Sequence, residues 1–149
     1  MSDPKKRDRL FLIPGFIVWT LVLIISFGNL RAPFFSLTSP MNVAGIVLFI
    51  IGLTIRVSAA VTLNKSYSPT LEVRDDHRLV KHGVYKYIRH PIYTGVFVGV
   101  LATPVYTSSL LGFLIALMTV PLFTYRMGVE EKMLTDEYGD EYREYMKAT

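Results

Sequence analysis

The sequence predicts an all-α integral membrane protein with four transmembrane helices, the last two forming a tight hairpin, and a C-terminal amphipathic helix in the cytosol. Hydrophobic residues make up 51% of the 149 residues and charged residues 19%, below the roughly 25% of ordinary soluble domains. The apolar residues form long runs, and basic residues concentrate in alternate segments between these runs. A chain of this length is typical of one domain, so we treat residues 1–149 as a single unit.

The first two apolar runs cover residues 10–30 and 41–63. The first follows a basic segment, but it is too long for the core of a signal peptide and has no small-residue cleavage site, so we expect a transmembrane helix. The second is long enough to cross a bilayer, which takes about 20 residues. It contains Arg56, the one formal charge in any predicted span. For this side chain we favour snorkelling to the polar surface or a structural hydrogen bond over a functional role.

The third and fourth apolar runs cover residues 92–106 and 110–125, and only Thr107-Ser108-Ser109 separates them clearly. Both are short for a hydrocarbon core of about 30 Å. A tight helical hairpin fits best, with its tip at the far surface and its polar ends returning to the same side. Pro121 is expected to kink the fourth helix near its polar end.

Two polar segments complete the chain. Residues 64–91 form a long connection, expected to be a cofactor-binding loop, and residues 128–147 have the pattern of an amphipathic surface helix, interrupted at Gly139. One face of this helix is acidic, and we expect it to pack over the basic 64–91 loop. A solvated tail helix is the alternative, since acidic surface faces are common.

The basic residues predict the topology. Four precede the first span, six lie between residues 64 and 91, and four follow the last span. The first loop has only Arg31, and the hairpin tip has none. Because cytoplasmic segments carry the excess of Lys and Arg, we expect a multi-pass protein with both termini and the 64–91 loop in the cytoplasm.

Charge, cysteine and histidine content exclude several functions. The net charge of +4 comes from basic residues beside apolar spans, which membrane topology explains better than nucleic-acid binding. The chain has no cysteine, which excludes disulfides, thiolate metal sites and a thiol nucleophile. The three histidines all lie in the 64–91 loop without a metal-ligand spacing, so we expect neither a metal site nor a haem held within the spans.

Two polar clusters remain as candidates for chemistry. The first ends in Arg89-His90-Pro91-Ile92-Tyr93. Pro91 keeps His90 out of the helical conformation and is suited to begin a helix. The His90 ring and the first-turn amides can then face a polar or anionic ligand, although a simple helix cap explains the pattern equally well.

The second cluster is Arg126 with Glu130, one helical turn apart where the last apolar run stops. An arginine there can present two donors to a carboxylate or phosphate whose apolar tail stays in lipid. Glu130 would then bind hydroxyl groups or a cation. An ordinary intrahelical ion pair is the alternative.

Five blocks in order carry a resemblance. They are His77-Arg78-Leu79-Val80, Gly83-Val84-Tyr85, Arg89-His90-Pro91-Ile92-Tyr93, Arg126-x-x-x-Glu130-Glu131-x-x-Leu134 and Tyr138-Gly139-x-x-Tyr142-x-x-Tyr145. In this order and beside apolar spans, they resemble the isoprenylcysteine carboxyl methyltransferase family, including its short prokaryotic members. The resemblance covers roughly residues 64–147.

The resemblance implies S-adenosylmethionine (SAM) as methyl donor, with S-adenosylhomocysteine as product, in a cytosolic pocket closed by the C-terminal helix. It assigns substrate contact to Arg126 and makes Arg126 and Glu130 the catalytic residues. The cofactor contacts that it implies fall on His77, Arg78, Leu79, Val80, Tyr85, His90, Pro91, Ile92, Tyr93 and Glu130.

The sequence also departs from the family pattern. A cofactor-binding glutamine of the eukaryotic enzymes aligns near Thr70, and the usual Phe-Gly of the tail is Tyr138-Gly139. We expect the chain to lack the additional N-terminal helices of the larger eukaryotic enzymes, so the resemblance does not extend to specificity for prenylated proteins.

We therefore expect a SAM-dependent membrane methyltransferase that acts on a lipophilic acceptor, either a small molecule or a prenylated substrate. The carboxylate of an isoprenylcysteine-like or other lipidic acid is the leading acceptor, because it is ionised at neutral pH and needs no general base. Positioning alone can lower such a barrier by about 7–11 kcal/mol. The alternatives are phospholipid or amine N-methylation, an NADPH oxidoreductase like the sterol reductases, whose C-terminal parts share Arg-His-Pro-x-Tyr, and a non-enzymatic four-span scaffold.

Overall fold

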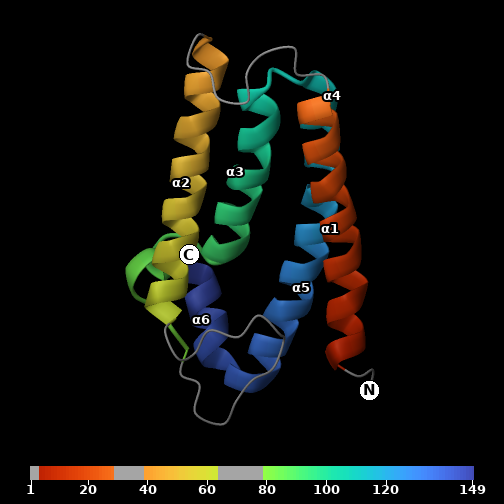
Figure 1. Ribbon diagram of the computed structural model, residues 1–149. Coiled ribbons are helices and arrows are strands. Elements are labelled where there is room, and N and C mark those ends of the chain that lie inside the picture. Colours follow the sequence, from red (N-terminus) through yellow and green to blue (C-terminus); the bar gives the residue numbers. More distant parts are fainter. Residues whose placement is uncertain (1–3, 29–38, 64–78) are drawn as a thin grey trace.

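The computed structural model describes residues 4–28, 39–63 and 79–149 (Figure 1). In these ranges the chain is helical and contains no strand, which confirms the all-α prediction. The predicted site residues His77 and Arg78 lie outside the described residues. The elements are α1 (Pro4–Gly28), α2 (Pro40–Leu63), the 3-10 helix η2 (Gly83–Lys86), α3 (Pro91–Tyr106), α4 (Leu110–Leu117), α5 (Thr119–Tyr138) and α6 (Asp140–Ala148).

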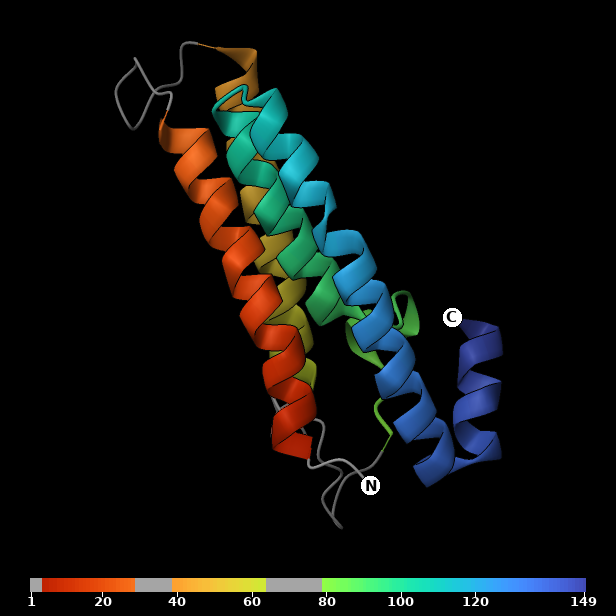
Figure 2. The same ribbon diagram turned by 90° about the vertical axis from the view of Figure 1, so that its right-hand side faces the viewer.

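The helices α1 to α5 form one elongated bundle in which α3 is central (Figures 1 and 2). Helix α2 packs along one side of α3, while α1 packs mainly against α4 and also against α3. The α3–α4 turn is tight: Ser108 has φ 53°, and the Ser109 side chain accepts a 3.1 Å hydrogen bond from the amide of Gly112 to cap α4. The polar ends of α3 and α5 therefore return to the same end of the bundle.

Glycines allow α2 and α3 to pack in close contact. A Cβ added to Gly52 would lie 2.7 Å from the carbonyl oxygen of Gly95, and a Cβ on Gly95 would lie 2.7 Å from that of Gly52. Small residues at such a crossing let two helix backbones approach closely. The first turns of α3 are thereby held against α2.

The fourth apolar run is divided into α4 and α5 by a break at Met118. Pro121 accounts for the break, since it has no N–H to donate to the carbonyl of Leu117 and its ring crowds that carbonyl. The kink expected from Pro121 therefore begins before the proline, on the apolar side of it, rather than close to Arg126.

Helix α5 does not end near residue 125, where the sequence predicted the end of the fourth span, but continues to Tyr138. The predicted start of a separate helix at residue 128 is therefore wrong. Gly128 is the only weak helix former there, and one glycine inside a helix costs only about 1 kcal/mol relative to alanine. The chain instead turns at Gly139, where φ is 55° and glycine is favoured, and α6 folds back beside α5 (Figure 2).

The outside of the bundle is apolar. By length and composition, Pro40–Leu63 and the nearly continuous helical segment Leu110–Tyr138 are able to cross a membrane, while Ile13–Gly28 and Pro91–Tyr106 are shorter apolar helices. Large apolar side chains are exposed along several helices, which is typical of a surface in contact with lipid. Examples are Phe16, Ile24, Phe49, Ile50, Val61, Leu110 and Leu111.

Candidate active site

Tyr93, Arg126 and Glu130 meet at the polar end of the bundle, as the sequence predicted for its two polar clusters. The Tyr93 hydroxyl, in the first turn of α3, donates a 2.8 Å hydrogen bond to Oε2 of Glu130 on α5. The Arg126 side chain donates to the same hydroxyl from one turn earlier in α5. The tyrosine thus lies between a cation and a carboxylate.

Arg126 is only 5% exposed. A buried guanidinium is stable only where it is paired or hydrogen-bonded, and its contact with Tyr93 meets part of that requirement. Arg126 directly follows the apolar run 110–125, so in a bilayer its charge would lie where hydrocarbon and polar surroundings meet. An acidic group on a lipophilic molecule would find a fixed donor there.

Glu131 is a site residue to which the sequence analysis gave no role. Its Oε1 accepts a 2.9 Å hydrogen bond from Nη1 of Arg89 and lies 3.0 Å from Nε2 of His90. The other terminal nitrogen of Arg89 donates to the carbonyl of Met146 at 2.7 Å. The signal in the sequence was the doublet of Glu130 with Glu131, since consecutive helical residues point in different directions and can serve two partners.

This geometry rules out one of the two interpretations of His90, the side-chain helix cap. The His90 side chain makes no capping hydrogen bond to α3, although Pro91 does begin the helix. Its ring faces Glu131 instead and lies 5.9 Å from the ring of Tyr93, centroid to centroid. His90 is therefore part of the polar cluster in which Glu131 of α5, Arg89 and Met146 of α6 also take part.

Helix α6 covers the segment that leads into α3. The Tyr145 hydroxyl donates to the carbonyl of Tyr85 in η2 at 2.7 Å, and Lys81 forms a 2.7 Å ion pair with Glu141. Burial raises the pKa of the Tyr145 phenol, which keeps it a neutral donor. The expected packing of the C-terminal helix over the 64–91 loop is thus present for the described part of that loop.

The remaining predicted residues lie in the same region. Tyr85 is buried, and Pro91 is the first residue of α3. Ile92 follows Pro91, while Leu79 and Val80 precede η2, and all three are half-buried.

Tyr142 reveals a polar position that the sequence analysis missed. It is 1% exposed, and its hydroxyl has no hydrogen-bond partner among the described residues. Burial raises its pKa, and the charges of Glu131 and Glu130 raise it further. An unsatisfied buried hydroxyl costs about 1–3 kcal/mol, so this donor is available to a bound polar molecule.

The residues at this end of the bundle fit SAM. Its ribose hydroxyls and ammonium group require acceptors such as Glu130, and its sulfonium is favoured near aromatic faces such as those of His90 and Tyr93. The unsatisfied hydroxyl of Tyr142 supplies a donor for a carboxylate or a ring nitrogen. The acceptors, aromatic faces and phenol donors of these residues thus match the hydroxyl, ammonium, sulfonium and carboxylate groups of this cofactor.

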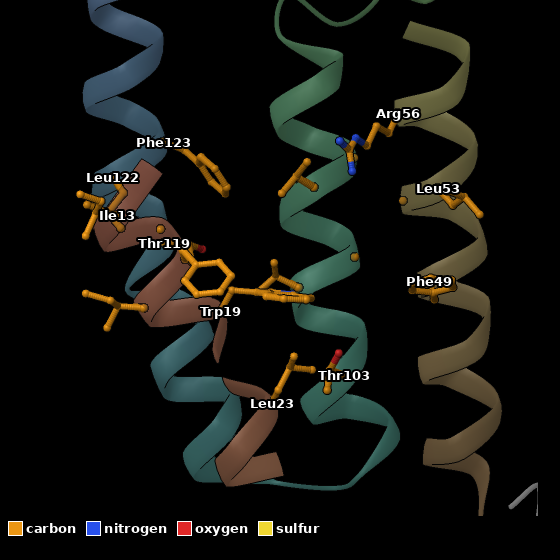
Figure 3. A pocket seen from close by; sticks show the side chains of 18 residues that line it. Ile13, Trp19, Leu23, Phe49, Leu53, Arg56, Thr103, Thr119, Leu122 and Phe123 are labelled. Atoms are coloured by element: carbon orange, nitrogen blue, oxygen red, sulfur yellow. The ribbon is translucent and has the colours of Figure 1, made fainter. Parts of the chain in front are cut away.

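A second feature, which the sequence analysis did not predict, is an apolar cavity of about 910 Å³ between α1, α2, α3 and α5 (Figure 3). Phe123 lines this cavity and also contacts Tyr93, with ring centroids 5.9 Å apart. The cavity and the polar site therefore share a wall. Arg56 is the one charged residue among those that line it.

The fold and these two features are those of a helical membrane protein with a cluster of polar side chains at one end of an apolar bundle. The chain belongs to the isoprenylcysteine carboxyl methyltransferase (ICMT) family, whose sequence model matches residues 45–136. The matched region contains Arg56, the start of α3 and the Arg126–Glu131 segment, whereas α1 and α6 lie outside it.

Known proteins of the family are similar over most of the chain. The protein-S-isoprenylcysteine O-methyltransferase of Saccharomyces cerevisiae is 34% identical over 133 residues, which are 87% of this chain and 56% of the yeast protein. That of Homo sapiens is 33% identical over 110 residues, 72% of this chain and 39% of the human protein. The chain thus spans about half the length of these relatives. These two relatives do not support the N-methylation or reductase alternatives.

A solved structure shows the same arrangement of helices. The structure of a eukaryotic intramembrane Ras methyltransferase, ICMT, superposes with a TM-score of 0.74 at 26% sequence identity. The match covers 93% of this chain and 50% of that one. The likeness extends over nearly all of the chain, including the first two helices, which the sequence motifs left unassigned.

Proposed function

We propose that this protein is a SAM-dependent membrane methyltransferase that esterifies the carboxylate of a lipophilic acid, most closely an isoprenylcysteine-like one. The observation that carries this proposal is the Tyr93–Arg126–Glu130 contact at the junction of the polar site and the apolar cavity. Family membership supports it, since the similar proteins are named protein-S-isoprenylcysteine O-methyltransferases.

SAM, when bound, would supply an electrophilic methyl group to the acceptor carboxylate and leave as S-adenosylhomocysteine, with no proton transfer needed. Glu130, Tyr93, His90 and Tyr142 would hold the cofactor. The described segment Leu79–Val80, together with Tyr85, Pro91 and Ile92, would line its surroundings. His77 and Arg78 remain predicted contacts.

Arg126 would orient the acceptor. Its planar guanidinium can bind both oxygens of a carboxylate, which fixes the direction of attack. Its contact with Tyr93 holds it beside Glu130, so acceptor and donor would be brought together by a single hydrogen-bonded group. Alignment is the main requirement of such a displacement.

The exclusion of water is the second contribution of the chain. Helix α6 is tied to η2 through Tyr145 and to the Arg89–Glu131 pair through Met146. A site enclosed in this way strengthens the electrostatic contacts inside it. We infer that α6 forms the cytosolic cover of the site.

In the membrane we propose four spans formed by α1, α2, α3 and the α4–α5 segment, with both termini in the cytoplasm. The arrangement of polar residues supports this topology. The polar ends of α3 and α5 lie together, and the Thr107–Ser109 turn lies at the other end of the bundle (Figure 2).

The test is transfer of a labelled methyl group from SAM to a farnesylated or long-chain carboxylic acid in detergent, with wild type and Arg126→Lys. We expect a base-labile methyl ester with wild type. We expect turnover at least about 100-fold lower with Arg126→Lys, since a lysine keeps the charge but not the planar pair of donors. SAM binding by calorimetry should change less than about threefold, because Arg126 is assigned to the acceptor. A base-stable product would contradict O-methylation.

A further inference from the structure

Arg89 connects three segments of the chain at the polar end of the bundle. It lies two residues before the start of α3. Its Nη1 donates a 2.9 Å hydrogen bond to Glu131 of α5, and its Nη2 donates a 2.7 Å hydrogen bond to the carbonyl of Met146 in α6. A guanidinium can serve two partners at once because its donors are fixed in a planar fork. We call these three residues the Arg89 joint.

Two members of the Arg89 joint are next in sequence to residues that we assign to the cofactor. Arg89 directly precedes His90, and Glu131 directly follows Glu130. The His90 ring also reaches the joint, since its Nε2 lies 3.0 Å from Oε1 of Glu131. The joint therefore fixes the start of α3 against α5 without using the side chain of Glu130.

The attachment of α6 depends on a small set of contacts. With nine residues, α6 is shorter than the roughly 12–15 residues that an isolated helix needs in water. The Lys81–Glu141 ion pair joins two exposed side chains, and exposed pairs contribute little. Among the described polar contacts, the hydrogen bond of Tyr145 to η2 and that of Arg89 to α6 remain as the stronger ties.

Glu131 is held in its ionised form within the joint. Burial by itself would raise its pKa, but the hydrogen bonds from Arg89 and His90 outweigh burial and keep the pKa of this carboxyl below its usual value. Both donors reach the same oxygen, Oε1. The ionised carboxylate in turn directs the Arg89 fork, so that its second nitrogen faces the end of α6.

We propose that Arg89 is a positioning residue that holds α6 over the cofactor end of the site, and that α6 detaches from Arg89 each time SAM enters or S-adenosylhomocysteine leaves. This inference rests on the proposed function. Arg89 then sets how long the cofactor stays bound and takes no part in the methyl transfer itself. The competing explanation is direct contact with the cofactor, because Nε of Arg89 is buried and has no partner among the described residues.

The first test compares Arg89→Met with Arg143→Met. Arg143 forms a 2.7 Å ion pair with Asp140 inside α6, so its removal is a matched loss of an arginine–carboxylate pair that joins no second helix. Arg89→Met should raise KM for SAM and the release rate of S-adenosylhomocysteine about tenfold or more, the effect of a lost charged hydrogen bond. KM for the acid should stay within about twofold, because the acceptor is bound elsewhere.

The control and the conservative variant complete this comparison. Arg143→Met should behave like wild type. Arg89→Lys should fall between Arg89→Met and wild type, since one ammonium cannot reproduce the planar fork. An unchanged release rate in Arg89→Met, or an equal increase in Arg143→Met, would overturn the inference.

Detachment of α6 can be measured directly, because the sequence contains no cysteine. Met146→Cys keeps the backbone carbonyl that Arg89 contacts, and its side chain is half-buried, whereas that of Lys147 is exposed. In ligand-free protein, a maleimide should modify the thiol at position 146 about tenfold faster when Arg89→Met is also present, since local opening is then easier. The thiol at position 147 should react at the same rate in both backgrounds. Equal rates at position 146 would contradict the role of Arg89.

A tether across the Lys81–Glu141 ion pair separates positioning from direct contact. Lys81→Cys and Glu141→Cys, joined by a short bifunctional maleimide with SAM already bound, would hold α6 in place without Arg89. In the Arg89→Met background the tether should return the release rate to within about threefold of wild type, because it makes reattachment intramolecular. If the tether restores nothing, Arg89 acts on the cofactor itself and the inference is wrong.

The same tether on an otherwise unchanged chain tests whether α6 has to move. We expect one methyl transfer from the enclosed SAM at the normal rate and little turnover after it, because product exchange is blocked. Cleavage of a reducible form of the tether should return steady turnover. Normal steady turnover with the tether intact would overturn the inference.

Turnover and thiol reactivity together distinguish this inference from the proposed function. An active wild type with unchanged cofactor release in Arg89→Met overturns the Arg89 joint and leaves the methyltransferase assignment intact. A faster thiol reaction at position 146 in Arg89→Met, with no methyl transfer by wild type to any acid, contradicts the proposed function and still supports the attachment of α6 by Arg89.

Discussion

At the scale of single residues, one phenol connects the two halves of the site. Tyr93 donates to Glu130 and accepts from Arg126, so it orders a carboxylate and a guanidinium that belong to the same face of α5. Its ring also contacts Phe123, which lines the apolar cavity between α1, α2, α3 and α5. The Tyr93 hydroxyl therefore makes the polar contacts and the ring makes the apolar ones. A substitution that removes only the hydroxyl tests the polar contacts.

Tyr93→Phe is expected to weaken SAM binding about tenfold, because Glu130 loses a charged hydrogen bond of roughly 1.5–3 kcal/mol. The ring contacts with Phe123 and His90 remain. Calorimetry measures the affinity. Tyr87→Phe, at a side chain 76% exposed, is the matched control and should bind like wild type; an equal loss in both variants would contradict the role of Tyr93.

At the scale of elements, α6 contains one buried hydroxyl that is hydrogen-bonded to η2 and one that has no partner among the described residues. Tyr145 and Tyr142 are successive tyrosines on its buried face, with ring centroids 5.9 Å apart. The Tyr145 hydroxyl is bonded to the Tyr85 carbonyl, whereas the Tyr142 hydroxyl has no partner among the described residues. The same chemical change at these two positions should therefore have opposite effects.

Tyr145→Phe is expected to destabilise the ligand-free protein by about 1 kcal/mol, the usual net value of a hydrogen bond. Tyr142→Phe should leave its stability unchanged or raise it slightly, since a buried unsatisfied hydroxyl is removed. Thermal unfolding without ligand measures both. SAM binding should be weakened by Tyr142→Phe; a Tyr142→Phe protein that is both less stable and unimpaired in binding would show that the hydroxyl serves the fold.

The α2–α3 contact is the second element-scale test. A Cβ on Gly95 would lie 2.8 Å from the amide nitrogen of Arg56 as well as close to the Gly52 carbonyl. Neither neighbour is a flexible side chain, so Gly95→Ala should force the helices apart and cost about 1–3 kcal/mol.

Gly99→Ala is the control for Gly95→Ala on the same helix. Its Cβ meets nothing within 4 Å, and alanine is the better helix former by about 1 kcal/mol. We expect a slightly higher unfolding temperature for Gly99→Ala and a clearly lower one for Gly95→Ala. Similar shifts in the two variants would contradict backbone packing as the cause.

At the scale of the whole molecule, the bundle separates two ends of different chemistry. The α3–α4 turn lies at one end and α6 lies at the other (Figures 1 and 2). Arg126 and Glu130 are on the part of α5 that leads to α6. A water-soluble cofactor and a lipid-soluble acceptor can meet only if the second end is a membrane surface with access to both. Topology is therefore a requirement of the proposed function.

The absence of cysteine from the sequence makes topology directly measurable. Single cysteines at Ser108 in the α3–α4 turn and at Lys147 in α6 should be labelled from opposite sides of sealed vesicles by an impermeant maleimide. We expect Lys147→Cys to react from the cytoplasmic side, because the basic segments predict that orientation. Reaction of both positions from one side would contradict a bundle that spans the membrane.

The sequence by itself predicted the helical class and the hairpin around Thr107–Ser109. It also predicted that Tyr93, Arg126 and Glu130 lie together at one end of the bundle. These are consequences of local composition: apolar runs of limited length, a short polar turn between two of them, and motifs at their ends. The sequence placed the end of the fourth helix wrongly, because the composition changes at residue 125 while the backbone has no reason to stop until Gly139.

Only the tertiary structure decided the pairing of Glu131 with Arg89 and His90, the unsatisfied hydroxyl of Tyr142 and the apolar cavity that Arg56 lines. Each of these depends on distances between segments tens of residues apart, set by how closely α2 approaches α3 and how α6 folds back. A helical pattern states which face a residue occupies. It does not state which segment packs against that face. The neighbouring segment determines whether an arginine on that face forms an ion pair or extends to the polar surface.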